Sequence, residues 1–183
     1  MELHGGWGKS LAVEHPAAAV GEGGDHGGKE TVALFEKYKI LNEREIHARY
    51  EVMVETYNKT VNVEGQLMVL MANRYILPAA LAYQTQVAQN VSAVKSAGGK
   101  SVEGKKTLDQ LTKLVDQLKQ RSDKLAKLLE HEGNGSAEKH AKHFRDVVIP
   151  AMSALRETGD QIELMTPHEI WPLPTYREML IIK

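Results

Sequence analysis

Apolar residues recur at helical spacing over most of the chain after residue 28. The clearest run lies between Lys105 and His131, where steps of three and four residues alternate. Its positions are Leu108, Leu111, Val115, Leu118, Ser122, Leu125 and Leu129. Such a heptad repeat, with Ser122 as a polar interruption, predicts a helix that packs along another helix, as in a coiled coil.

A second heptad run follows closer to the C-terminus. Its positions are Phe144, Val148, Ala151, Leu155, Thr158, Ile162 and Met165. Pro150 predicts a kink in this helix because proline removes a backbone donor. Gly133, Asn134 and Gly135 separate the two runs. Two matched heptad helices joined by a Gly-rich turn predict an antiparallel hairpin.

The region before these runs predicts a short helix and then a long one. Glu30 to Tyr38 is amphipathic, and Asn42 with Glu45 predicts a capping box at the start of the long helix. The long helix carries one apolar stripe at Ile46, Tyr50, Met53, Tyr57, Val61, Met68, Met71 and Tyr75. A second stripe comprises Val63, Leu67, Leu70 and Leu77. Since a helix that is apolar on more than one side is usually buried, we expect it at the centre of a bundle.

Prolines and glycines divide the helical stretches. At Pro78 the long helix should kink or restart, and the helical pattern continues through 79–97. Gly98, Gly99 and Gly104 should bracket a loop. Pro167, Pro172 and Pro174 end helical structure, and the apolar segment 171–182 should dock rather than fray. Since almost no segment alternates with period two, we expect an all-α fold: an elongated helical bundle with an antiparallel heptad hairpin.

Residues 1–28 differ from the rest of the chain. They hold eight of the fifteen glycines and show no periodicity, so we expect a flexible, disordered tail or a vector-derived remnant. Residues 29–183 then form the helical domain. Gly8-Lys9-Ser10 resembles the end of a phosphate-binding loop, but Leu3 stands where that motif requires its first glycine. The phosphate-loop interpretation is therefore not favoured.

Composition excludes several classes of protein. Lys and Arg total 23 against 24 Asp and Glu, which argues against a nucleic-acid binder. The absence of cysteine excludes disulfides, thiolate metal sites and cysteine nucleophiles. No apolar run reaches the ~20 residues of a membrane-spanning helix, and the start does not read as a signal peptide. We therefore expect a cytoplasmic protein with no membrane and no nucleic-acid partner.

Few residues suggest chemistry. A di-metal carboxylate site in a bundle needs Glu-x-x-His pairs, and none of the histidines is preceded by an acidic residue at that spacing. His140 and His143 share a helix face and could bind a metal weakly, although solvated histidines are the favoured reading. Glu64, which fills a gap within the first stripe, is the candidate for a perturbed acid, and the favoured alternative is a carboxylate at the stripe's edge that meets water or a cation. We assign no catalytic, cofactor-binding or metal-binding residue.

Several short blocks resemble the C-terminal region of type III glutamine synthetases. They are Val32 to Tyr38, Leu41 to Glu51, Tyr57 to Glu64, Ile76 to Ala80 and Trp171 to Leu180. They occur in the right order, and the resemblance covers residues 30–183.

The resemblance implies a parent glutamate–ammonia ligase that makes glutamine with ATP and Mg²⁺ or Mn²⁺, through a γ-glutamyl phosphate. In that family the metal-binding glutamates, phosphate-binding arginines and glycine-rich substrate loop lie upstream of such a region, and none of these motifs occurs here. The implied partners are the catalytic part of the subunit and further copies in a homo-oligomer, and we expect the chain alone to be inactive. The alternative is a stand-alone helical-hairpin module that binds another protein.

Overall fold

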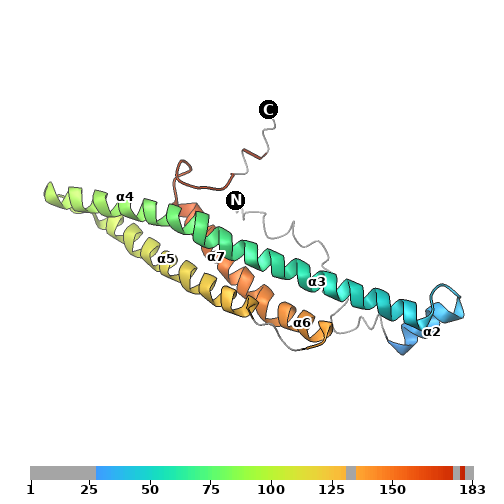
Figure 1. The fold of residues 1–183 in the computed structure, drawn as a ribbon. Coiled ribbons are helices and arrows are strands. Elements are labelled where there is room, and N and C mark those ends of the chain that lie inside the picture. The colour runs from blue at the N-terminus through green and yellow to red at the C-terminus, as the bar shows by residue number, and fades with distance from the viewer. Residues whose placement is uncertain (1–27, 131–134, 175–177, 180–183) are drawn as a thin grey trace. The chain divides into compact units, whose positions relative to one another are not determined.

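A computed structural model describes residues 28–130, 135–174 and 178–179 (Figure 1). The tail predicted for residues 1–28 lies outside the described residues, apart from Gly28. In the described part the elements are, in chain order, α2 (Lys29–Lys37), α3 (Glu43–Met71), η2 (Ala72–Ile76), α4 (Leu77–Ser96), α5 (Val102–Leu129), α6 (Ala137–His143), η3 (Phe144–Val148) and α7 (Ile149–Met165). The two η elements are π-helical turns. Because the described residues form helices and no strand, the all-α prediction is confirmed.

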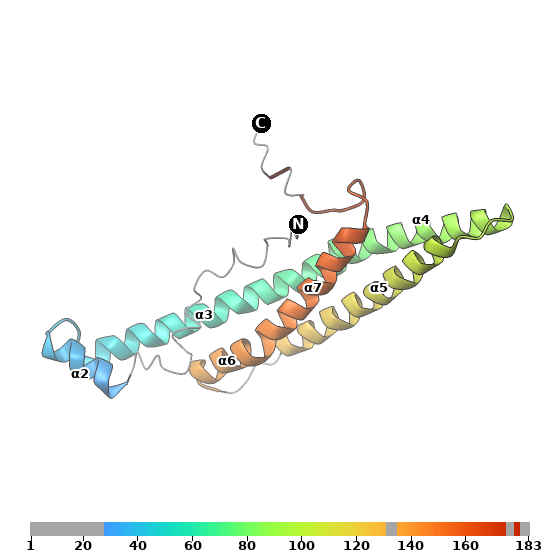
Figure 2. The ribbon, with the colours of Figure 1, turned by 180° about the vertical axis from the view of Figure 1, so that it is seen from behind.

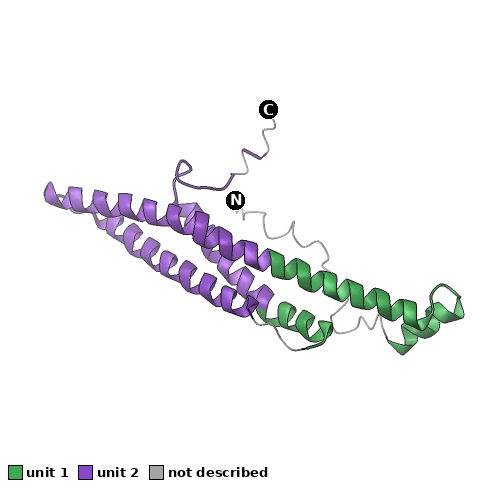
Figure 3. Ribbon diagram, viewed as in Figure 1, with its two compact units in different colours: residues 1–63, 132–147 green, residues 64–131, 148–183 purple. Residues whose placement is uncertain are grey.

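The chain divides into two compact units (Figure 3). The first comprises residues 1–63 and 132–147, and the second comprises residues 64–131 and 148–183. Helix α3 therefore contributes its first part to one unit and its last turns to the other.

In the first unit, the predicted capping box is present at the start of α3. The Asn42 backbone N–H donates to Glu45 Oε2 at 2.9 Å, and the Glu45 backbone N–H donates to Asn42 Oδ1 at 3.0 Å. Both donors would otherwise lack a partner inside the helix. Further along α3, Asn58 Nδ2 donates to the Ala137 carbonyl at 2.8 Å, which ties α3 to the start of α6.

The first apolar stripe of α3 is inward-facing over most of its length in this unit. Tyr57 and Val61 are almost fully buried. The prediction that Met53 belongs to this stripe is wrong, because Met53 is exposed and its neighbour Val54 is buried instead. The reason is the helical period: 3.6 residues per turn moves the inward position from a step of three to a step of four.

In the second unit α5 lies alongside both α4 and α7 (Figures 1 and 2). The heptad positions Leu111, Leu118 and Leu125 are at most 1% exposed, and Leu155, Thr158 and Ile162 of α7 are buried as well. The expected packing of the two heptad helices is therefore confirmed. The turn predicted at Gly133 to Gly135 lies outside the described residues, except for Gly135.

The expectation that the long helix with two stripes is central is wrong for this unit. Helix α5 has neighbours on two sides, whereas Leu67 and Leu70 of the second stripe are exposed on α3. An apolar pattern on two faces therefore does not mark the core helix here.

A polar layer crosses the core of the second unit at the heptad interruption. Asn73 Nδ2 donates to Ser122 Oγ at 2.7 Å and also to the Val69 carbonyl. One residue away, the Arg121 guanidinium donates to the Ala154 carbonyl and to Thr158 Oγ1, both at 2.6 Å. These bonds connect η2 to α5 and α5 to α7. They also give hydrogen-bond partners to polar groups whose burial without a partner would lower the stability of the fold.

Each π-helical turn lies just before a proline. Pro78 follows η2 and Pro150 follows η3, both in the first turn of the next α-helix. A proline ring collides with the carbonyl four residues earlier, and here that carbonyl belongs to Arg74 or Asp146, inside the wider turn. The Leu77 N–H reaches back five residues to the Ala72 carbonyl. Helix α4 begins at Leu77 with Pro78 in its first turn, so of the two predicted outcomes the structure shows the restart.

The turn between α4 and α5 depends on Gly98, whose φ is 81°. Its N–H donates to the Lys95 carbonyl and the Gly99 N–H to the Val94 carbonyl, which is the Schellman pattern of a helix end. Gly104 was predicted to bracket this loop, and that prediction is wrong because α5 begins at Val102. A Cβ at Gly104 would lie 3.0 Å from Val91 Cγ2, so glycine allows α5 to approach α4 closely.

Candidate functional site

The residues singled out from the sequence do not form a reaction centre with one another. Glu64 is half-buried in α3, at the edge of its buried positions. His140 and His143 both lie on α6, where the His143 ring meets the Phe144 ring edge-on at 6.2 Å between centroids. Across the described residues, no three His, Asp or Glu side chains are grouped so that they could hold a metal ion. The assignment of no catalytic residue stays a prediction.

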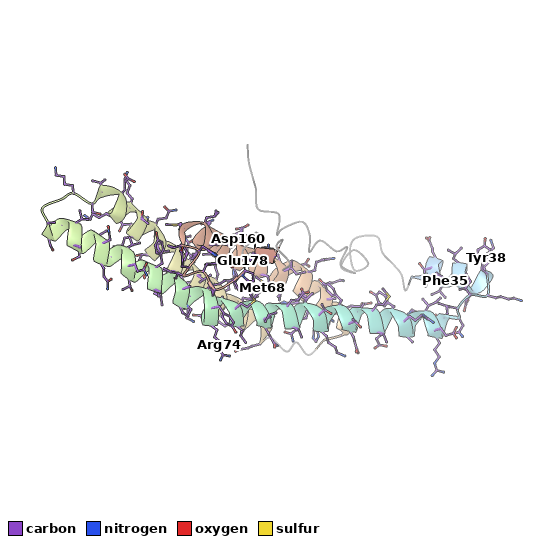
Figure 4. All side chains as sticks on the ribbon, turned by 90° about the horizontal axis from the view of Figure 1, so that it is seen from above. Phe35, Tyr38, Met68, Arg74, Asp160 and Glu178 are labelled. Carbon is purple, nitrogen blue, oxygen red and sulfur yellow. The ribbon has the colours of Figure 1, made fainter. Side chains whose placement is uncertain are left out.

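A surface with unusual composition lies on the last turns of α3, on η2 and on α4. Between residues 65 and 94, Arg74 is the one charged residue in the sequence. Side chains exposed along this stretch include Leu67, Leu70, Tyr75 and Leu81, which are 43–53% exposed. We call these four residues together with Arg74 the Arg74 face. In Figure 4 the Arg74 side chain projects outward from its helix.

The exposed side of α5 is the contrast within the same unit. It carries Lys113, Asp116, Lys119 and Asp123, and Lys119 pairs with Asp123. Mixed charges of this kind are typical of a helix surface that remains in water. The Arg74 face lacks them, and depletion of charge is the compositional mark of the centre of a protein–protein interface.

A second feature joins the end of α7 to the segment that follows it. Trp171 is buried, which confirms that this part of the closing segment is docked, and its indole N–H faces the Glu163 carboxylate without completing a hydrogen bond of ordinary geometry. Burial raises the pKa of Glu163 above its ordinary value, and the neighbouring Asp160 carboxylate raises it further. The Trp171 indole and Arg156 lower the same pKa, but burial is the largest influence and the net shift is upward.

No described helix is both long enough and apolar enough to cross a membrane.

Residues 25–95 match the family model described as the glutamine synthetase C-terminal domain. The type-3 glutamine synthetase of Dictyostelium discoideum is 25% identical over 166 residues, which are 85% of this chain and 22% of that protein. The predicted resemblance to type III glutamine synthetase is confirmed.

Two bacterial relatives support the same conclusion. The glutamine synthetase of Bacteroides fragilis is 28% identical over 79% of this chain and 21% of its own length. That of Butyrivibrio fibrisolvens is 28% identical over 82% of this chain and 22% of its own length. The chain thus spans about a fifth of the length of the glutamine synthetases that it matches.

The glutamine synthetase C-terminal match contains the whole Arg74 face. Sequence reasoning overlooked this face because it took the second stripe as core. The signal that could have found it is the run of thirty residues with a single charge, since an exposed helix in water normally carries several.

Proposed function

We propose that this chain is the helical C-terminal part of a glutamine synthetase-type subunit and serves to hold that subunit together or to its neighbours. The observation that carries the proposal is the extent of the match. Relatives named glutamine synthetase align over 79–85% of this chain but over only 21–22% of their own length. A segment of that kind supplies packing surfaces, and the catalytic groups come from the remaining four fifths.

In this proposal the parent subunit makes glutamine from glutamate and ammonia with ATP, as the family resemblance implies. ATP and Mg²⁺ or Mn²⁺ belong to the other part of the subunit. The whole enzyme would be a cytoplasmic homo-oligomer, with α5 and α7 paired as a short coiled coil.

Assays of glutamine formation test the proposal in two steps. The purified chain alone should show no turnover that depends on ATP and glutamate. When the chain is combined with the glutamine synthetase catalytic part from the same genome, glutamine formation should depend on both. Turnover by the chain alone, in protein free of host enzyme, would contradict the proposal. Full activity of the catalytic part without the chain would instead favour the stand-alone interaction module.

A further inference from the structure

We propose that the Arg74 face is the surface by which this chain docks onto the catalytic part of its own subunit, and that Arg74 pairs there with a carboxylate. The inference rests on the proposed function and assigns to it a surface and an anchoring residue. The occupant is a largely apolar protein surface that presents an acidic side chain.

The Arg74 face exposes apolar side chains on a stretch that carries a single charged residue. Leu67, Leu70 and Tyr75 are each between 43 and 53% exposed, and no charged side chain other than Arg74 occurs between Gly65 and Val94. Several exposed apolar side chains on a stretch with so little charge are typical of a binding surface on a soluble protein. Tyr and Arg are also the residue types that most often carry the binding energy of an interface.

Arg74 is a positive charge that has no carboxylate partner among the described residues, a state that it shares with most of the described Lys and Arg side chains. What sets Arg74 apart is that residues 65–94 contain no Asp or Glu that could pair with it. A guanidinium on an apolar surface favours a planar, bidentate contact with a carboxylate. The partner surface should therefore supply an Asp or Glu opposite Arg74.

A second copy of this chain that used the same face would not fit as the occupant. Residues 65–94 contain no Asp and no Glu, so two such faces would offer no carboxylate to either Arg74. Such a pairing would also bring like charges together on an otherwise uncharged surface, which is costly.

The remaining part of a glutamine synthetase-type protein is a source of such a partner surface. The matched relatives are between four and five times as long as the segment that this chain covers. The Arg74 face lies inside the stretch matched to the glutamine synthetase C-terminal domain. In those relatives the matched segment and the rest of the protein belong to one chain, so the rest is present at high effective concentration around the segment. A lipid surface is a poorer fit, because helices that lie on membranes are rich in Lys and Arg.

Binding to the catalytic part of the glutamine synthetase from the same genome tests the docking. We expect Leu70→Glu and Arg74→Glu to weaken binding at least tenfold, which is the scale of an interface anchor. Two matched controls place comparable changes elsewhere. Leu164→Glu introduces the same residue on α7, where Leu164 is 88% exposed, and Lys113→Glu reverses a positive charge on α5. Both controls should bind within twofold of the wild type, and circular dichroism should show that all four variants remain helical.

Site-directed crosslinking identifies the occupant. A photo-crosslinking residue at position 70 should join the chain to the catalytic part, and one at position 164 should not. Binding by Leu70→Glu and Arg74→Glu within twofold of the wild type would overturn the docking surface, and so would crosslinks from position 70 to a second copy or to anionic lipid vesicles. If the genome encodes no catalytic part, both the proposed function and the proposed docking partner are wrong. If wild type and all variants bind equally, only the docking surface fails.

Discussion

The Asn73 side-chain amide donates a hydrogen bond to the Ser122 hydroxyl across the core of the second unit, at 2.7 Å. Asn73 belongs to the π-helical turn before Pro78, and Ser122 is the polar interruption in the α5 heptad. A polar pair in an apolar seam fixes the register of its helices, because any shift leaves a buried donor without an acceptor.

We expect Ser122→Ala to lower the free energy of unfolding by ~1 kcal/mol, the usual net worth of a hydrogen bond. Urea denaturation measures this change. A double-mutant cycle with Asn73→Ala should give a coupling energy of at least about 0.5 kcal/mol. Additive effects of the two substitutions would show that the pair does not act as a unit.

Leu118 lies in the seam where α5 meets its neighbours and is 1% exposed. Its replacement by alanine should cost ~2–5 kcal/mol, because a buried cavity is created. Leu164→Ala is the control, since that side chain projects from α7 and surface substitutions stay within about 0.5 kcal/mol. Equal melting temperatures for the two variants would contradict the assigned packing of α5.

Two glycines should respond to alanine in opposite directions. Gly159 lies inside α7, and an added Cβ would meet Ile76 Cδ1 at an ordinary 3.7 Å. Gly159→Ala should stabilise by up to about 1 kcal/mol because alanine favours helix. Gly98→Ala should destabilise by about 1 kcal/mol, since Gly98 has a φ of 81°. Thermal unfolding of both variants checks the signs, and a loss of stability in Gly159→Ala would show that α7 and η2 have no room for the added methyl group.

Glu163 should titrate above the ordinary range for a glutamate. Its pKa is raised mainly by burial and then by Asp160. The folded state therefore binds this proton more tightly than the unfolded state, so stability declines as pH rises through the raised pKa. Carboxyl NMR shifts measure the titration. Trp171→Phe should raise the pKa further, because it removes the indole N–H that favours the charged form. An unchanged pKa of Glu163 in that variant would show that the Trp171 indole does not act on the Glu163 carboxylate.

Local sequence signals predicted the parts of the fold that depend on neighbouring residues. Asn42 and Glu45 formed the expected cap, and the central heptad leucines of α5, Leu111, Leu118 and Leu125, are buried as their spacing indicated. These features follow from periods and capping chemistry that need no distant partner.

Features that depend on distant partners could not be predicted in the same way. The second stripe of α3 has the apolar spacing of a core face, and only the placement of α5 shows that Leu67 and Leu70 remain outside. Period alone cannot say whether an apolar face meets the same chain or another one. The π-helical turn likewise rotates the residues around Tyr75, a predicted stripe member that is exposed.

In the proposed function this chain works as part of a glutamine-forming enzyme and carries none of its catalytic groups. An antibody against the chain, used to precipitate it in native form from the source cells, tests the claim most directly. The precipitate should form glutamine from glutamate and ammonia, and the activity should require added ATP. A precipitate that contains the chain but forms no glutamine would contradict the account.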